Sequence, residues 1–351
     1  MAQNYDWHDT NDPIGMMYRT LAKTAQDLEQ KIIEGNATET DRLNLDHVYQ
    51  VLIPWWHFPM LNNSLRASLF EKALEKINVK DKVVLDIGSG TGLLAMMAAR
   101  QGARSVVACE LNSTLATLSK RIVAQNGYSD TVTIVNAVSS DLKVLDALPE
   151  PADVIVTEIV EEALIGENII NTLRHARQEL LEPSGTIIPR RGRLYGRCVE
   201  SSAMHGLNHV GETVGFDVSL FNKFSIHGHF PVRFELWPRT YLSDPFLIYD
   251  FDFMSHDLAE KQSEIQVTAT NTGVLHGVIL WFELDLVDGI IWSSTPADFS
   301  MDAQKTPNQD PHIYKQQTGI VTFSRPDRVG EKSTIKMGFD CANNRVTVDL
   351  L

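Results

Sequence analysis

The residues from Val83 to Glu110 restrict the possible folds of this chain more than any other stretch. An apolar run ends at Asp86, glycines recur over residues 88–92, a helical pattern continues to Arg100, and a second apolar run leads to Glu110. Strand, glycine loop, helix and strand in this order form a βαβ unit that binds a ligand at its loop. The glycines let the backbone approach the ligand, and an acidic residue about 20 positions later binds ribose hydroxyls.

The spacing within the loop narrows the choice of ligand. Gly88, Gly90 and Gly92 follow the pattern GxGxG rather than GxGxxG, and no Gly-Lys-Ser/Thr motif follows to hold a phosphate. Because this phosphate chemistry is missing, the loop favours a nucleoside cofactor without a pyrophosphate. S-adenosylmethionine (SAM) fits, and an NAD-binding Rossmann domain is the alternative.

Short apolar runs alternate with helical patterns from Lys82 to Pro189. This alternation predicts a parallel, doubly wound sheet whose ligands bind at the carboxyl ends of the strands, where Asp86, Glu110 and Glu158 fall. The predicted strands are Val83–Ile87, Ser105–Cys109, Val132–Asn136, Val154–Glu158 and a last one near Thr186–Pro189, and the predicted helices are Leu93–Arg100, Ser113–Asn126 and Ile169–Leu180.

Two other regions flank this predicted cofactor domain of residues 51–189. Residues 1–50 are expected to form a helical arm, because Thr20–Ile33 and Asp41–Val51 carry helical patterns. After Arg190 the apolar residues alternate in steps of two between turn residues, which predicts an antiparallel β domain, a barrel or a sandwich, over residues 190–351.

Composition excludes several classes of protein. A formal net charge of −14 disfavours nonspecific binding to a nucleic-acid backbone. The 3 cysteines have no CxxC spacing, which predicts a reduced, cytoplasmic protein without a disulfide framework or zinc site. No apolar run approaches the length of a membrane span, so neither secretion nor membrane insertion is expected. The histidine pairs at 205/209 and 227/229 show no third ligand in sequence, so no metal site is predicted.

Four carboxylates follow the fourth predicted strand: Glu158, Glu161, Glu162 and Glu167. Carboxylates gathered at the mouth of a cofactor site repel one another unless a cation binds among them. A guanidinium suits such a site, because carboxylates can bind its planar fork of donors in pairs. The alternative is a charged surface loop.

Glu158 and Glu167, nine positions apart, resemble the double-E loop of the protein arginine methyltransferase family. The resemblance extends over nearly the whole chain from about residue 45. EALIGE and LSDPFLIYDFDF are most similar to the monomethylating, type III branch, or to a bacterial free-L-arginine methyltransferase of the same family. The other matching pieces, in chain order, are His57 with Met60 and Arg66 (an H-x-x-M…R helix), DIGSGTG, Glu110, IIPRRGRLY and GFDVSLFN.

The resemblance implies a Rossmann-like class I methyltransferase domain followed by an antiparallel β-barrel with a dimerisation arm at about residues 205–235, and therefore a homodimer. It implies that Glu158 and Glu167 are the catalytic pair, that Arg66 binds the cofactor carboxylate, and that S-adenosylhomocysteine is the product of the cofactor. The full set implied for cofactor binding is His57, Met60, Arg66, Asp86, Gly88, Gly90, Gly92, Glu110, Leu111, Val138, Ser139 and Ser140.

The acceptor side departs from the family pattern. Relatives carry Thr-His-Trp near the C-terminus, whereas this chain reads Pro-His-Ile-Tyr-Lys-Gln over residues 311–316, and the family's N-terminal YFxxY helix is not evident. These departures leave the reaction type unchanged and leave the carrier of the arginine open. The residues expected to bind the acceptor are Glu161, His312, Tyr314 and Gln316.

The sequence therefore predicts SAM-dependent N-methylation of an arginine guanidinium, with a monomethyl product. The acceptor is either free L-arginine or an arginine in a protein or peptide. One alternative is a small-molecule N- or O-methyltransferase without a preference for guanidines. The other is a catalytically silent scaffold that binds SAM.

Overall fold

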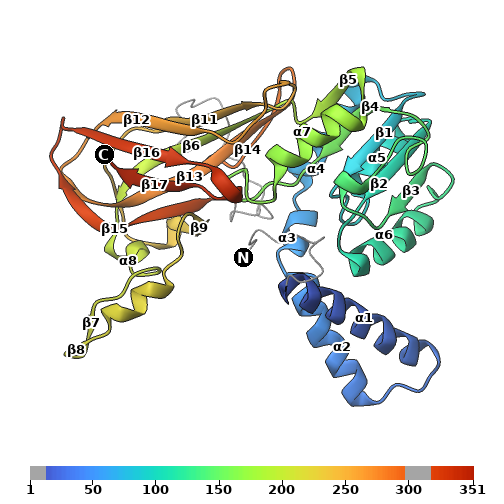
Figure 1. The fold of residues 1–351 in the computed structure, drawn as a ribbon, viewed down its shortest axis with the longest axis horizontal. Helices are drawn as coiled ribbons and strands as arrows, with labels where there is room; N and C mark the ends of the chain where they lie inside the picture. The colour runs from blue at the N-terminus through green and yellow to red at the C-terminus, as the bar shows by residue number, and fades with distance from the viewer. Residues whose placement is uncertain (1–12, 297–317) are drawn as a thin grey trace. The chain divides into compact units, whose positions relative to one another are not determined.

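The computed structural model describes residues 13–296 and 318–351, and these form two compact units (Figure 1). The first unit contains residues 13–158 and 175–189 of the described chain. The second contains residues 159–174, 190–296 and 318–351. The loop that follows Glu158 therefore belongs to the second unit, whereas Glu158 itself belongs to the first.

A five-stranded parallel sheet forms the centre of the first unit. Its strand order is β3-β2-β1-β4-β5, so the chain reverses its direction of growth at β1. Every residue of β1 is buried, as expected for a central strand covered on both faces. The strands are β1 (Val83–Ile87), β2 (Ser105–Cys109), β3 (Val132–Val135), β4 (Ala152–Thr157) and β5 (Leu181–Ile188).

Helices connect these strands (Figure 1). The side chain of Asn112 caps α6 by accepting hydrogen bonds from the N–H groups of Thr114 and Leu115, at 3.0 and 3.2 Å. The side chain of Asn63 caps α4 in the same way through the N–H of Arg66, at 3.0 Å. The helices are α4 (Ser64–Ile77), α5 (Leu93–Arg100), α6 (Ser113–Gln125), α7 (Ile169–Glu179) and the 3-10 helix η1 (Ser139–Asp141).

The N-terminal segment is a helical hairpin of α1 (Pro13–Ile33) and α2 (Glu39–Leu52), followed by the short α3 (His57–Leu61). A capping box between Thr38 and Asp41 starts α2. The predicted helices are confirmed, and α1 begins seven residues before the predicted start. The two helices share a small core of Ala25, Leu28, Leu45, Val48 and Leu52.

The second unit contains antiparallel sheets, as predicted. Its larger sheet has the order β10-β6-β13-β15-β9, with β11 paired to β6 and β14 to β13, and a second sheet has the order β12-β16-β17. The strands are β6 (Arg191–Glu200), β9 (Phe230–Pro231), β10 (Thr240–Tyr241), β11 (Phe246–Asp252), β12 (Gln262–Thr268), β13 (Gly273–Val287), β14 (Ile290–Ser293), β15 (Gly319–Val329), β16 (Thr334–Asp340) and β17 (Thr347–Leu350).

An arm projects from the sheets of the second unit (Figure 1). Its 3-10 helix η2 (Ser219–Phe224) carries apolar side chains in water, with Leu220 88%, Phe221 65% and Phe224 66% exposed. Such a set of exposed apolar side chains is unusual on the surface of a monomeric protein. The elements of this region are α8 (Ser202–His205), β7 (Glu212–Thr213), β8 (Phe216–Asp217), η2 (Ser219–Phe224) and η3 (Phe234–Leu236), and the last 3-10 helix of the chain is η5 (Ala342–Asn344).

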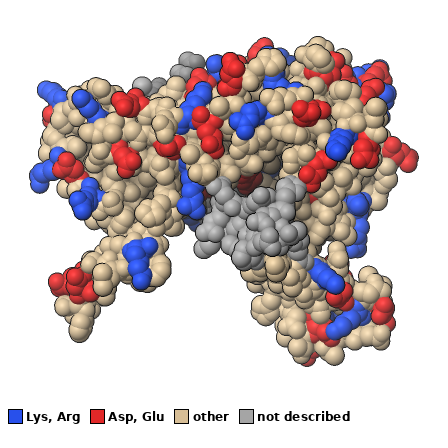
Figure 2. Space-filling model, in the orientation of Figure 1, with Lys and Arg blue, Asp and Glu red and all other residues tan. Residues whose placement is uncertain are grey.

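On the face shown in Figure 2, Lys and Arg are interspersed with Asp and Glu. Among the described residues, no helix combines the length and apolar character needed to cross a membrane.

Candidate active site

The glycine loop joins the carboxyl end of β1 to the start of α5. Gly88, Gly90 and Gly92 have φ angles of 70°, 55° and 77°, which lie in the left-handed region that favours glycine. The N–H groups of Gly88 and Ser89 both donate to the carbonyl of Cys109 on β2, at 3.0 Å. The loop is thereby held on the neighbouring strand, with its backbone free of side chains at the three glycines.

Asp86 is fully buried at the end of β1. Its Oδ2 accepts a hydrogen bond from the N–H of Ala95 on α5, at 3.0 Å. Its Oδ1 is buried and has no hydrogen-bond partner in the described part of the chain. Burial raises the pKa of Asp86 to about 7, and the nearby charges of Glu110 and Glu158 act in the same direction.

Glu110 follows β2 and points its carboxylate back to the glycine loop. One oxygen accepts from the N–H of Gly90 at 2.9 Å and the other from the N–H of Asn112 at 2.8 Å. Each carboxylate oxygen can accept a second hydrogen bond, so both stay able to bind hydroxyl groups. Burial raises the pKa of Glu110 although these backbone donors lower it.

Two asparagines that sequence reasoning missed hold Glu110 in place. Asn136 donates to the carbonyls of Glu110 and Leu111, at 2.8 and 3.0 Å. Asn112 donates its side-chain N–H to the carbonyl of Leu52 at the end of α2, at 2.7 Å. The position of Asn112 just before a predicted helix was a usable signal, because asparagine is a favoured N-cap.

Three of the residues that the resemblance implies for cofactor binding, Val138, Ser139 and Ser140, lie after β3. Ser139 is buried and begins η1. The carbonyl of Val138 accepts the N–H of Asp141 at 3.0 Å, which closes the turn that also contains Ser140. The structure thus keeps Val138, Ser139 and Ser140 together in one short turn.

Arg66 and Glu158 form a buried ion pair within the first unit. Their side chains are 7% and 5% exposed, and the guanidinium contacts the carboxylate directly. Arg66 also donates to the carbonyl of Met60 at 3.1 Å, while its buried Nε has no partner in the described residues. The pKa of Glu158 is raised by burial, and the charge of Arg66 opposes that shift. Glu158 therefore already binds a guanidinium, that of its own chain.

His57 lies at the start of α3. Its ring stacks on Trp56 with centroids 3.9 Å apart, and its Nδ1 is 2.9 Å from the carbonyl of Pro54. Burial lowers the pKa of His57, although the contact with the carbonyl of Pro54 opposes that shift.

The loop from Glu158 to Glu167 brings its other carboxylates to the second unit. Glu161 turns back onto its own loop and accepts from the N–H groups of Ala163 and Gly166, at 2.8 and 2.7 Å. His229 lies beside it, with Nε2 3.1 Å from the carboxylate. Glu167 is half-buried. His312, Tyr314 and Gln316, predicted for the acceptor, lie outside the described residues.

Two family models match consecutive parts of the chain. The model described as ribosomal protein L11 methyltransferase matches residues 67–190, and that described as the arginine methyltransferase oligomerization subdomain matches residues 191–349.

Among curated proteins, an arginine N(omega)-methyltransferase of Streptomyces achromogenes is 38% identical over 84% of this chain and 79% of its own length. The chain belongs to the protein arginine methyltransferase family. Protein arginine N-methyltransferase 7 of Oryza sativa is 31% identical over 72% of this chain, and protein arginine N-methyltransferase 9 of Xenopus laevis is 32% identical over 81%. The matches span only 38% and 39% of those two longer relatives.

Solved structures of arginine methyltransferases share the fold. A chain of the Trypanosoma brucei PRMT1 enzyme–prozyme heterotetrameric complex with AdoHcy superimposes at a TM-score of 0.67 and is 22% identical in sequence. The match covers 84% of this chain and 92% of that chain. Arabidopsis thaliana protein arginine methyltransferase 10 matches 86% and 93% at a TM-score of 0.65 and 19% identity. The expected fold, a Rossmann-like methyltransferase domain followed by a barrel-like antiparallel domain, is confirmed.

The residues of this arginine methyltransferase fit SAM. Asp86 Oδ1 is a buried acceptor and Arg66 Nε is a buried donor, and neither has a hydrogen-bond partner in the described chain. The amino-acid part of SAM carries an ammonium, which is a donor, and a carboxylate, which is an acceptor, so it can satisfy both kinds of atom. The carboxylate of Glu110 beside the glycine loop suits the ribose hydroxyls. SAM is the cofactor of this family member.

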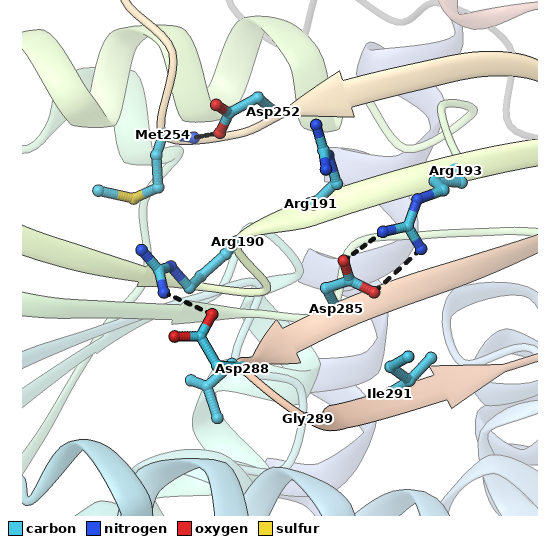
Figure 3. Close-up of a pocket in the computed structure, with 10 residues that line it drawn as sticks. Arg190, Arg191, Arg193, Asp252, Met254, Asp285, Asp288, Gly289 and Ile291 are labelled. Carbon is cyan, nitrogen blue, oxygen red and sulfur yellow. Dashed lines mark hydrogen bonds and ion pairs between the residues drawn. The ribbon is translucent and has the colours of Figure 1, made fainter.

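A separate pocket of about 460 Å³ lies in the second unit of the methyltransferase (Figure 3). Arg190 pairs with Asp288 at 3.0 Å, and Arg193 pairs with Asp285 through two bonds of 3.1 and 2.5 Å. Since carboxylates neutralise these cations and no predicted site residue lines the pocket, we do not assign it to the reaction. Its lining residues are Arg190, Arg191, Arg193, Asp252, Met254, Asp285, Val287, Asp288, Gly289 and Ile291.

Proposed function

We propose that this SAM-dependent arginine N-methyltransferase adds a single methyl group to a terminal guanidinium nitrogen, with free L-arginine or an arginine in a peptide as acceptor. The observation that supports the choice of guanidinium best is the ion pair of Arg66 with Glu158. In this pair the carboxylate after β4 contacts a guanidinium in a buried setting, which supports the same kind of contact with an acceptor. The ω nitrogen in the name of the Streptomyces relative is such a terminal nitrogen.

Glu158 and Glu167 are the proposed guanidinium-binding pair. A guanidinium stays protonated at neutral pH, so an ordinary side chain cannot activate it by removing a proton first. Two carboxylates bound to one side of the group draw its positive charge toward them, and the remaining terminal nitrogen becomes more nucleophilic. Holding that nitrogen in line with the methyl group removes several kcal/mol of the barrier.

The bound cofactor supplies an electrophilic methyl group on its sulfonium. In the overall transfer the N–CH₃ bond forms as the S–CH₃ bond breaks, S-adenosylhomocysteine leaves, and the extra proton passes from the guanidinium to a carboxylate or to water. For this role Arg66 has to release Glu158 to the acceptor and bind the carboxylate of the cofactor, as proposed from its place in the sequence.

We also propose that the protein works as a cytoplasmic homodimer. The exposed apolar side chains of η2 in the arm, Leu220, Phe221 and Phe224, support self-association, and so does the match to an oligomerization subdomain. The three buried free cysteines, Cys109, Cys198 and Cys341, suit a reducing compartment.

The test of the proposed function supplies methyl-labelled SAM with three acceptors in parallel: free L-arginine, an arginine-rich peptide and a lysine peptide of the same length. We expect label in an arginine acceptor and none in lysine, and mass spectrometry after hydrolysis should find monomethylarginine without dimethylarginine. The more active arginine sample identifies the carrier. An absence of label from both arginine samples would reject the proposal.

A further inference from the structure

The loop that carries the proposed catalytic pair is closed by one of its own side chains. Both oxygens of Glu161 accept from backbone N–H groups, Oε2 from Ala163 and Oε1 from Gly166. Gly166 has no room for a side chain, because a Cβ there would lie 2.4 Å from the Cγ of Glu161. Since Glu167 follows Gly166 directly, this bond fixes the backbone from which Glu167 extends.

His229 connects the loop to a second part of the same unit. The backbone N–H of Val346 donates to its Nδ1 at 3.0 Å, and the N–H of His229 donates to the carbonyl of Val346 at the same distance. A backbone N–H can only donate, so Nδ1 acts as an acceptor and carries no hydrogen. The hydrogen of the neutral ring is therefore on Nε2, which faces Glu161 at 3.1 Å.

Burial disfavours a charged His229, but the adjacent Glu161 raises the pKa of its imidazole. With Nδ1 held as an acceptor by Val346, the contact is a hydrogen bond from Nε2 to the carboxylate of Glu161. Its two side chains are only 8% and 13% exposed. Burial disfavours the charged form of Glu161, yet its three donors lower the pKa of the carboxyl. Burial and the charge of Glu161 raise the pKa of the adjacent Glu162 to about 8.

Glu161, Glu162 and His229 also have the composition of a metal site, with ligand atoms within 4.8 Å of one another. A metal ligand has to offer a lone pair, and the tautomer set by Val346 places a hydrogen on the nitrogen that faces the carboxylates. The geometry thus favours the hydrogen-bonded pair over a metal.

We propose that Glu161 and His229 form a positioning pair that holds the loop in the conformation from which Glu167 binds the acceptor. The inference rests on the proposed function, because it concerns the same loop. It gives Glu161 a role through the loop, whereas the sequence predicted direct contact with the acceptor.

The experiment combines kinetics with hydrogen–deuterium exchange on the full-length protein. His229→Ala removes the donor, His229→Gln keeps an N–H donor, and Glu161→Gln weakens the acceptor. His227→Ala is the matched control, because His227 is an exposed histidine two positions earlier. We expect His229→Ala to lower kcat about 10- to 100-fold, with the KM for arginine and the affinity for SAM changed less than about threefold.

Two readouts identify positioning. The double variant His229→Ala/Glu161→Gln should be no slower than the slower single variant, because the proposed role of His229 is exerted only through Glu161. Exchange in the peptide of residues 159–168 should rise in His229→Ala and stay at the wild-type level in His227→Ala. His229→Gln should recover part of the lost kcat.

Several results would overturn the pair. In the kinetics, they are losses of kcat that multiply in the double variant, or a Glu161→Gln enzyme that is altered only in the KM for arginine. In the exchange measurement, it is an unchanged rate in the 159–168 peptide. A methyltransferase activity that a chelator removes and zinc restores would also overturn the pair. A wild-type enzyme without activity on any arginine acceptor would instead reject the proposed function, and the exchange measurement would still judge the pair.

Discussion

Arg66 and Glu158 lie 92 positions apart in the chain, and their side chains meet in a buried ion pair. The sequence predicted each charge for a different ligand, Arg66 for the cofactor carboxylate and Glu158 for the guanidinium of the acceptor. Breaking a buried pair by removing one partner leaves an uncompensated charge, which is costly. In the structure the two residues satisfy each other, and we expect the cofactor and the acceptor to replace this contact.

Asp86 gives a prediction about pH. Its pKa is about 7 in the folded protein, whereas an unfolded aspartate titrates near 4. Between these values the folded state binds more protons than the unfolded state, so the stability of the ligand-free protein should fall as the pH rises from about 4 to about 7. Asp86→Asn removes this pH-dependent contribution to the free energy of unfolding, which amounts to at most about 1.4 kcal/mol per pH unit.

Urea denaturation of wild type and Asp86→Asn at pH values from about 5 to about 8 measures the effect. The advantage of the variant should grow with pH up to about 7 and then level off. Parallel curves for the two proteins would show that Asp86 ionises normally.

At the scale of elements, local patterns predicted most of the first unit. The predicted β1, β2 and α5 have the observed bounds. β5 begins at Leu181, five residues before its predicted start, because Pro183, Ser184 and Gly185 lack the composition of a strand, and its pairing with β4 is irregular. The start of such a strand depends on its pairing with the neighbouring strand of the sheet. A local sequence pattern does not contain that information.

The same limit applies to the loop after β4. Its four glutamates are visible in the sequence, yet the partner of Glu161 is not. Spacing alone paired His229 with His227, whereas the fold pairs His229 with Glu161 and Val346. Sequence motifs therefore predicted this loop as the catalytic region, whereas the contacts within it depend on residues far apart in the chain.

The start of α5 offers a test with a matched control. Gly92 and Gly127 have nearly equal φ angles, 77° and 78°. A Cβ at Gly92 would lie 2.8 Å from the Oγ of Ser119, while a Cβ at Gly127 meets nothing within 4 Å. Alanine at either position pays about 1–2 kcal/mol for the left-handed backbone, and Gly92→Ala should cost at least about 1 kcal/mol more because of overpacking. Equal losses in urea denaturation would contradict this packing.

For the whole molecule, the exposed arm should decide the assembly. The paired change Leu220→Asp and Phe221→Asp places charges on its apolar η2 segment and should convert a dimer into a monomer in analytical ultracentrifugation. Leu145→Asp is the control, because Leu145 is 84% exposed and lies in the first unit. An η2 variant that sediments like wild type would exclude this part of the arm as the dimer contact.

The central claim is that two carboxylates select a guanidinium, and the most direct measurement is kcat/KM for the arginine acceptor in Glu158→Gln and Glu167→Gln. The affinity for S-adenosylhomocysteine is measured alongside to verify the cofactor site. We predict a loss of at least about 10²-fold in each variant, with the affinity of Glu167→Gln for S-adenosylhomocysteine within about threefold of wild type. Full activity in both variants would contradict the account and indicate a methyltransferase without a preference for guanidines.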